Sequence, residues 1–211
     1  MLFGDPKFKP LADLANESVR SPNNFNWTFI AIFAVVVILY INEAEKKNYR
    51  VIKAALALYL VHWFYEIINA LICYFFGYAL WSVSPESSSF ILLIGVSWEL
   101  SMMFAIAGFT IKLMPKNKDA KIFGINNRLV YIIGTALGFS IFEIFLAWTP
   151  AFIWVYKWWG AIPVFITTYI PFFFACSWTY DATLIKQKKF LSIMAILDIA
   201  LLVILIPLKI I

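Results

Sequence analysis

Apolar runs separated by short charged loops set the pattern of the chain. Six such runs lie at approximately residues 27–41, 51–76, 90–113, 129–148, 152–180 and 190–206. An α-helix needs about 20 apolar residues to cross a bilayer, and most of these runs reach or approach that length. The pattern therefore predicts an all-α fold, a polytopic membrane helix bundle with six transmembrane helices.

The residues before the first run have a different character. Residues 1–25 are polar and balance three basic against three acidic side chains. We predict a polar N-terminal tail there, with one amphipathic turn at residues 11–15, followed by a transmembrane domain at residues 26–211.

Composition supports a membrane protein. Hydrophobic residues make up 63% of the chain and charged residues 14%, whereas soluble domains average about 45–50% apolar and 25% charged residues. A net charge of +5 would suit an anionic partner, but the basic residues fall in the short loops. We therefore predict the membrane as the partner and no nucleic acid.

The few potential metal ligands narrow the chemistry. His62 is the single histidine, so the chain cannot build a multi-histidine iron site or a bis-histidine haem site. Cys73 and Cys176 lie inside apolar runs and are expected to act as small buried hydrophobes. We predict no metal and no cofactor.

The loops predict an orientation in the membrane. Three loops are rich in basic residues, and the other two contain only Lys157 between them. By the positive-inside rule the three basic loops are cytoplasmic and both termini lie on the opposite side. Tryptophans near the run ends, such as Trp81, Trp154 and Trp159, are expected to anchor the helices at the interface. The basic residues are Lys46, Lys47, Arg50 and Lys53, then Lys112, Lys116, Lys118, Lys121 and Arg128, then Lys186, Lys188 and Lys189.

Candidate chemistry begins in the second run. Polar side chains recur there at steps of three and four, which puts them on one helix face. An ionisable side chain in hydrocarbon costs about 2.5–3.5 kcal/mol on insertion scales, so this face is expected to point to protein or to a polar cavity. The stripe consists of Tyr59, His62, Glu66, Asn69 and Cys73.

Three runs each contain one glutamate far from their ends, namely Glu66, Glu99 and Glu143. With about 1.5 Å of rise per residue, all three are expected about 10–15 Å below the non-cytoplasmic surface. Buried carboxylates at close quarters cannot all be ionised, so one can donate a proton while another, supported by His62 or Asn69, accepts one. Each glutamate can instead simply bond to a neighbouring helix.

Several of these features resemble the EXPERA family, over residues 51–181. The resemblance implies a cavity that opens within the membrane, in which Glu66 and Glu99 form a donor and acceptor pair assisted by His62 for isomerisation of a sterol double bond. The matching positions are His62-x-x-x-Glu66 in the second run, Glu99 in the third, Gly134-x-x-x-Gly138 in the fourth and Asp181 at the end of the fifth.

From these observations we predict an intramembrane lipid-modifying enzyme, an isomerase or cyclase that moves protons on an isoprenoid or sterol-like substrate. The predicted catalytic residues are His62, Glu66 and Glu99. The predicted substrate-binding residues are Tyr59, Asn69, Trp98, Glu143 and Thr168.

Three other functions fit the same sequence. The carboxylates can hold a hydrophobic small molecule or lipid without catalysis, or pass protons or cations through the bundle. The chain can also be an accessory subunit of a membrane complex, and the sequence leaves a homo-oligomer open.

Overall fold

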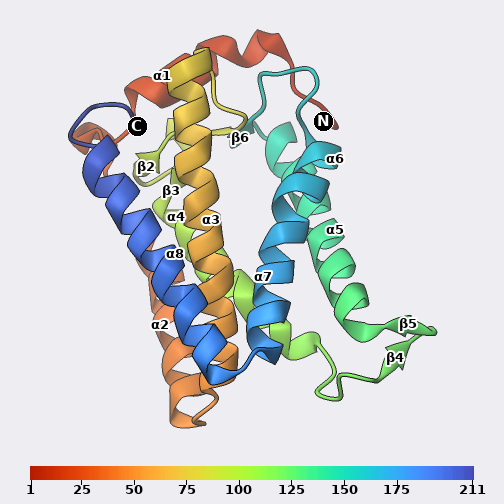
Figure 1. Cartoon of the computed structure of the whole chain (residues 1–211). Coiled ribbons are helices and arrows are strands. Elements are labelled where there is room, and N and C mark those ends of the chain that lie inside the picture. The colour runs from red at the N-terminus through yellow and green to blue at the C-terminus, as the bar shows by residue number, and fades with distance from the viewer.

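The structure is a computed structural model, and it describes residues 1–211, the side chain of Asn24 excepted. Helices form most of the chain, and three short antiparallel strand pairs join them (Figure 1). The α-helices are α1 (Lys9–Glu17), α2 (Ile30–Glu45), α3 (Tyr49–Phe76), α4 (Trp98–Ala107), α5 (Asn127–Trp148), α6 (Ala161–Val164), α7 (Ile170–Asp181) and α8 (Leu184–Leu205). The strands are β1 (Ser82–Val83), β2 (Ile91–Leu93), β3 (Val96–Ser97), β4 (Lys121–Ile122), β5 (Ile125–Asn126) and β6 (Phe152–Ile153).

Three described helices are long and apolar enough to cross a membrane, namely α3, α5 and the continuous helix Ala161–Asp181. The last of these joins α6 to α7 through a π-helical segment, Phe165–Tyr169. The predicted helical fold is therefore confirmed, but six transmembrane helices are not. The other helices fall short because α2 has 16 residues and α4 has 10, and because lysines occupy the first two turns of α8.

The third apolar run differs most from the prediction. Its first residues form the hairpin β2–β3, and the helix begins only at Trp98. A short apolar strand and a short apolar helix segment have the same hydropathy, so the run at residues 90–113 looks like one helix in the sequence. This hairpin shifts Glu99 from the middle of a helix into its first turn.

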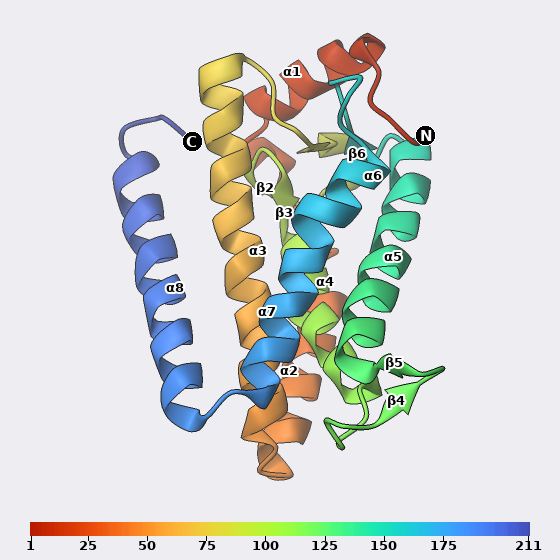
Figure 2. The same ribbon diagram turned by 45° about the vertical axis from the view of Figure 1, so that its right-hand side comes forward.

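The first 25 residues pack against the rest of the chain. In Figures 1 and 2, α1 crosses the end of the bundle at which both termini lie. Ala12 and Ala15 are the buried residues of α1, and the amide of Gly4 donates to the Trp159 carbonyl over 2.8 Å. The expected amphipathic turn is part of a nine-residue helix, and the segment lies across one end of the bundle (Figure 1).

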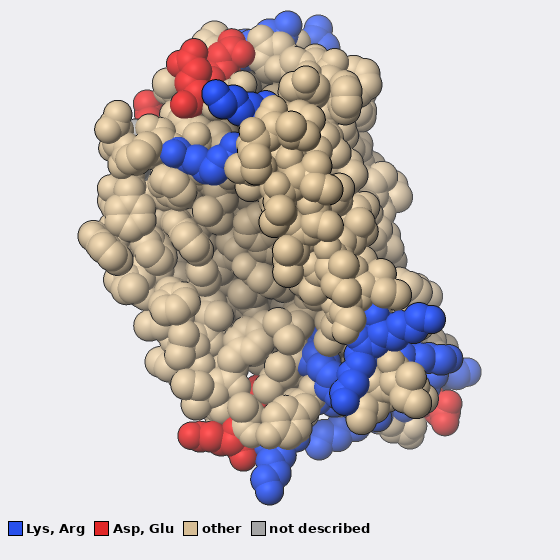
Figure 3. Space-filling view, turned by 60° about the vertical axis from the view of Figure 1, so that its left-hand side comes forward, with Lys and Arg blue, Asp and Glu red and all other residues tan. Residues whose placement is uncertain are grey.

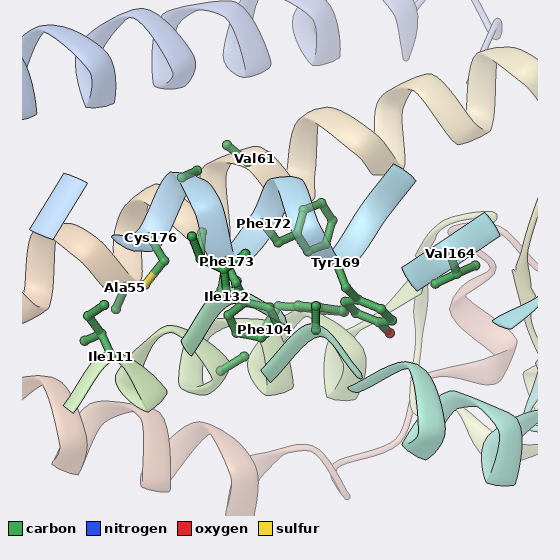
Figure 4. Close-up of a cluster of buried hydrophobic side chains, with 14 of the residues drawn as sticks. Ala55, Val61, Phe104, Ile111, Ile132, Val164, Tyr169, Phe172, Phe173 and Cys176 are labelled. Carbon is green, nitrogen blue, oxygen red and sulfur yellow. The ribbon is translucent and has the colours of Figure 1, made fainter. Parts of the chain in front are cut away.

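Helix α3 runs through the centre of the bundle, beside α7 and α8 (Figure 2). It buries a series of alanines, including Ala54, Ala55 and Ala57, whose small side chains allow close approach. The segment after α4 packs directly on these alanines. A Cβ added at Gly108 would lie closer than 3.0 Å to the Ala55 backbone. Large aromatic residues fill the rest of the core (Figure 4).

Gly134 and Gly138 do not form a close helix crossing within this chain. Both are exposed on α5, and an added Cβ at either position would meet no atom of the described residues within 4 Å. The spacing of this glycine pair is typical of a close helix crossing, but the pair makes none within the described residues.

Charged residues gather at the two ends of the molecule. Figure 3 shows one face on which lysines, arginines and acidic residues occupy the top and bottom, with a broad uncharged band hollowed at its centre between them. At the end opposite the termini, Arg128 forms a two-bond ion pair with Asp181, at 2.9 and 2.8 Å. At the same end Lys112 donates to Glu43 over 2.6 Å. Such a band between charged ends is the surface expected of a protein surrounded by lipid.

Candidate functional site

The site starts from one turn of α3. His62 and Glu66 lie on the same helix face, with Nε2 of His62 3.2 Å from Oε1 of Glu66. Both side chains are buried, and the His62 ring stacks on Phe104 with its centroid 4.0 Å away. The histidine contact is close enough for an ion pair but lacks hydrogen-bond geometry, and neither ring nitrogen has a hydrogen-bond partner among the described residues. The predicted HxxxE pair is therefore in contact.

Glu66 is fixed by a tryptophan just before β1. The indole Nε1 of Trp81 lies 3.1 Å from each oxygen of Glu66 and donates to the carboxylate. Gly95, in the β2–β3 turn, packs tightly against this contact. An added Cβ there would lie closer than 3.0 Å to polar atoms of Glu66, Asn69 and Trp81. The absence of a side chain at Gly95 lets the hairpin reach the carboxylate.

Glu143 of α5 also accepts a hydrogen bond from a tryptophan, which follows β6, the strand paired with β1. Trp154, just after β6, donates its Nε1 to Oε1 of Glu143 over 3.2 Å, and the Tyr169 hydroxyl lies beside the same carboxylate. Strands β1 and β6 pair antiparallel, with Ser82 opposite Ile153. One small sheet therefore presents an indole donor to each of two buried glutamates on different helices.

Both glutamates and His62 line one small cavity, which we term the chamber. Its volume is about 20 Å³, which is room for about one water molecule. Aromatic side chains form most of the remaining wall, and Figure 4 shows the Tyr169 hydroxyl at the edge of the aromatic cluster, pointing away from Phe172. The chamber thus combines three ionisable side chains with apolar walls.

A larger pocket of about 430 Å³, the apolar groove, lies against the chamber. Residues of α2, α4 and α5 line it, and Glu99 is its one acidic side chain. The same side chains form the wall between the two spaces, namely Leu100, Met103, Phe142, Leu146 and Phe152. Met103 has a flexible, unbranched side chain that can take several shapes in such a wall.

The structure pairs Glu66 with Glu143 in the chamber, and it does not bring Glu99 there. Oε1 of Glu99 accepts the backbone amide of Ser89 over 2.8 Å, which ties it to the loop before β2. Its other oxygen is buried without a hydrogen-bond partner among the described residues. The resemblance implied a Glu66–Glu99 pair, and the reason it does not form is the β2–β3 hairpin described above.

Two of the predicted binding residues have positioning roles. The Asn69 side chain accepts the amide of Leu80 and donates to the carbonyl of Trp81, each over 2.8 Å, so it holds the loop that carries the indole. Tyr59 shares a hydrogen bond with Ser101 of α4 over 2.9 Å. Neither residue lines the chamber.

Trp98 and Thr168, two more of the predicted binding residues, lie in different places. Trp98 stacks on Phe29 with the ring centroids 5.4 Å apart and lines neither the chamber nor the groove. Thr168 does line the chamber, and its hydroxyl has no hydrogen-bond partner among the described residues. No group of three or more His, Cys, Asp or Glu in the described chain is arranged to hold a metal ion.

Sequence reasoning missed the two indole donors. Trp81 and Trp154 were expected at the membrane interface, but their exposed fractions are 5% and 1%. Their positions within six residues of a run end are typical of interfacial anchors, and the pairing of β1 with β6 has no signal in the local sequence. Both tryptophans are therefore part of the site.

The chain belongs to a membrane protein family. The profile of an uncharacterized membrane protein family matches residues 9–207. An uncharacterized protein of Archaeoglobus fulgidus is 39% identical over 185 residues, which cover 84% of this chain and 88% of the relative. No solved structure matches the chain. The expected membership of the EXPERA family is wrong, because the matching profile and the relative both lie outside it.

Proposed function

We propose that this family member binds the hydrocarbon chain of a lipid in the apolar groove and transfers protons to and from that lipid in the chamber. The observation that carries the proposal is the shared wall between a 430 Å³ apolar groove and a cavity lined by two carboxylates and a histidine. Two buried acids in a cavity beside an apolar groove are candidates for proton exchange with an apolar ligand. An unsaturated isoprenoid-type lipid fits this chemistry.

The proposed step is a double-bond shift that consumes no net proton. Protonated Glu143 gives its proton to one carbon of a C=C bond, which leaves a carbocation on the neighbouring carbon. Ionised Glu66 then removes a proton from the adjacent carbon, and the double bond re-forms one position along. Attack of a second double bond on the same cation would instead form a ring and move the positive charge to the other carbon of that bond, and ionised Glu66 would then remove a proton from the carbon beside it. Aromatic faces such as Phe104 and Phe172 favour the cation.

The roles of the two acids follow from their neighbours. His62 lies 3.2 Å from Glu66 and, when protonated, supplies a positive charge that stabilises the ionised carboxylate there. Glu143 has neutral neighbours, Trp154 and Tyr169. A water molecule fits in the chamber and can return the proton from Glu66 to Glu143 after each cycle. The side chains of Leu100, Met103 and Phe142 must move to admit the reacting carbons.

For the membrane orientation, we propose that six helical segments cross the bilayer and that the basic loops are cytoplasmic. Both chain ends lie at one end of the molecule, and the β4–β5 turn with its lysines lies at the other (Figure 1). This separation agrees with the positive-inside rule. It places the chamber in the half of the bilayer on the non-cytoplasmic side.

The test is incubation of the purified protein with polyprenoid lipids in deuterated water. We expect deuterium at allylic carbons with the wild-type protein, and a loss of at least about 100-fold in rate for Glu66→Gln and Glu143→Gln, the usual contribution of a general acid or base. Glu86→Gln, at an exposed glutamate in a loop, is the matched control. Incorporation that persists in both glutamine variants would refute the proposed roles.

A second function, binding of a lipid without catalysis, is favoured by the small size of the chamber. A cavity of about 20 Å³ holds no part of a lipid unless its wall moves. In that case the groove alone binds the ligand, and Glu99 is the acidic group that the ligand meets. Thermal stabilisation by a lipid that is recovered unchanged, and that Glu99→Gln weakens while Glu143→Gln does not, would favour this alternative.

A further inference from the structure

A third cavity lies on the other side of the chamber from the apolar groove. Helices α3 and α7 diverge towards the end that carries the termini (Figures 1 and 2). A pocket of about 400 Å³, the lateral pocket, lies between α3 and the π-helical segment that precedes α7. Its walls include apolar side chains of α3, among them Phe64, Ile68 and Ile72. Trp81 and Thr168 separate it from the chamber, since both line the two spaces.

Two buried polar groups in this pocket have no protein partner. The indole Nε1 of Trp159 and the hydroxyl of Thr168 are buried and make no hydrogen bond to any described residue. The exposed fractions of the two residues are only 5% and 6%, so bulk water does not replace the missing bonds. Leaving such a donor unpaired costs about 1–3 kcal/mol, and an indole N–H can be satisfied only by an acceptor atom.

The local backbone makes the Thr168 hydroxyl unusual. Thr167, its neighbour, donates its hydroxyl to the carbonyl of Pro163 over 2.7 Å, which is the normal way for a helical threonine to satisfy itself. Thr168 does not do so, and it lies in the π-helical segment Phe165–Tyr169. Single π-helical turns inside α-helices often occur at ligand sites.

The Trp159 side chain is held in place rather than free to turn away. Its ring stacks nearly parallel on Trp81, with centroids 5.9 Å apart and an interplanar angle of 22°. The edge of Trp158 packs against it at 5.7 Å. The Trp159 ring is therefore fixed where it lines an apolar pocket, and a fixed polar group beside such a pocket is a typical arrangement for binding one polar atom of a hydrophobic ligand.

We infer that the lateral pocket binds a membrane lipid through a carbonyl oxygen, which accepts hydrogen bonds from Trp159 and Thr168. A carbonyl oxygen has two lone pairs and can accept both bonds, and the apolar wall of α3 receives the attached hydrocarbon chain. This site is distinct from the proposed reaction site, because the carboxylates of Glu66 and Glu143 do not line it.

The test compares a long-chain methyl ketone with the n-alkane of the same length, each added to the purified protein and measured by native mass spectrometry. The wild-type protein should bind the ketone about 30-fold more tightly, the ratio expected from two ordinary hydrogen bonds of about 1 kcal/mol each. Trp159→Phe should lower this preference to about fivefold, because only the Thr168 bond remains. The matched control is Trp148→Phe, at an exposed tryptophan that does not line the pocket, and it should keep the preference.

A second substitution guards against misfolding of the tryptophan variant. Thr168→Val keeps the shape of the side chain and removes the hydroxyl, so it should reduce the ketone preference without changing alkane binding. Glu143→Gln should leave the preference unchanged, and its loss there would mean that the ketone occupies the chamber. Any of three results would overturn the inference. They are loss of the preference in Glu143→Gln, equal binding of ketone and alkane to the wild-type protein, and a preference that is undiminished in Trp159→Phe and Thr168→Val.

Discussion

Substitution of Gly95 by alanine should disrupt the site without replacing a charged residue. The hairpin turn brings Gly95 so close to α3 that a methyl group there would lie closer than 3.0 Å to Oε2 of Glu66, Nδ2 of Asn69 and Nε1 of Trp81. Real Cβ atoms do not tolerate such contacts, so the hairpin or the polar cluster must move. The backbone angle at Gly95 is one that alanine can adopt, and the effect is therefore purely steric.

The magnitude follows from what the methyl group displaces. Separating the Trp81 indole from Glu66 removes a hydrogen bond to a carboxylate, which is worth about 1.5–3 kcal/mol. Overpacking a buried site adds about 1–3 kcal/mol. We therefore expect the Gly95→Ala protein to lose about 3–5 kcal/mol of stability, which lowers the midpoint of thermal denaturation by about 10 °C for a chain of this size.

The assay is thermal denaturation in detergent, followed by intrinsic fluorescence and by the fraction of monodisperse protein. Gly138→Ala is the matched control, since an added Cβ at that exposed helical position meets no described atom within 4 Å. It should be neutral or stabilising by up to about 1 kcal/mol, because alanine favours a helix over glycine. If Gly95→Ala denatures at the same temperature as Gly138→Ala, the packing of the hairpin on the glutamate is not as described.

Two further predictions concern the other glutamates. Trp154→Phe leaves the buried Glu143 carboxylate without its indole donor, so stability should fall by about 1–3 kcal/mol in the same assay, and adding Glu143→Leu should recover part of the loss. The hydrogen bond from Lys112 holds the pKa of Glu43, outside the predicted membrane spans, below its usual value. The stability that this bond contributes is present above the ordinary pKa of glutamate and is lost as the pH falls through the pKa of Glu43 in the folded protein. The wild-type protein should therefore be more stable than Lys112→Ala by about 1 kcal/mol at neutral pH. In melting curves recorded at decreasing pH, this difference in stability should disappear. An advantage that is constant down to the acid-denatured state would contradict this assignment.

Helical periodicity predicted the contacts that lie within one helix. His62 and Glu66 are four residues apart, and a regular α3 brings them together whatever surrounds them. The burial of Asn69 on the same stripe follows for the same reason. The sequence also supported a helical membrane protein, because its apolar runs are long.

Contacts between distant segments could not be read in the same way. The prediction that grouped Glu99 with Glu66 assumed a regular helix from residue 90. That assumption is wrong because Ile91–Leu93 and Val96–Ser97 form strands, and their hydropathy is the same as that of a helix segment. The partner of Glu66 is instead Glu143, through a sheet that pairs residues about 70 positions apart. Neither hydropathy nor residue spacing predicts the pairing of β1 with β6.

A double-mutant cycle tests the central claim most directly, namely that Glu66 and Glu143 share one chamber. The stabilities of Glu66→Gln, Glu143→Gln and the double variant are measured by denaturation in detergent, together with the parallel cycle for Glu66 and Glu99. We predict an interaction energy of at least about 1 kcal/mol for Glu66 with Glu143 and additive effects, within about 0.5 kcal/mol, for Glu66 with Glu99. Additive effects for Glu66 with Glu143, or strong coupling only between Glu66 and Glu99, would contradict the account.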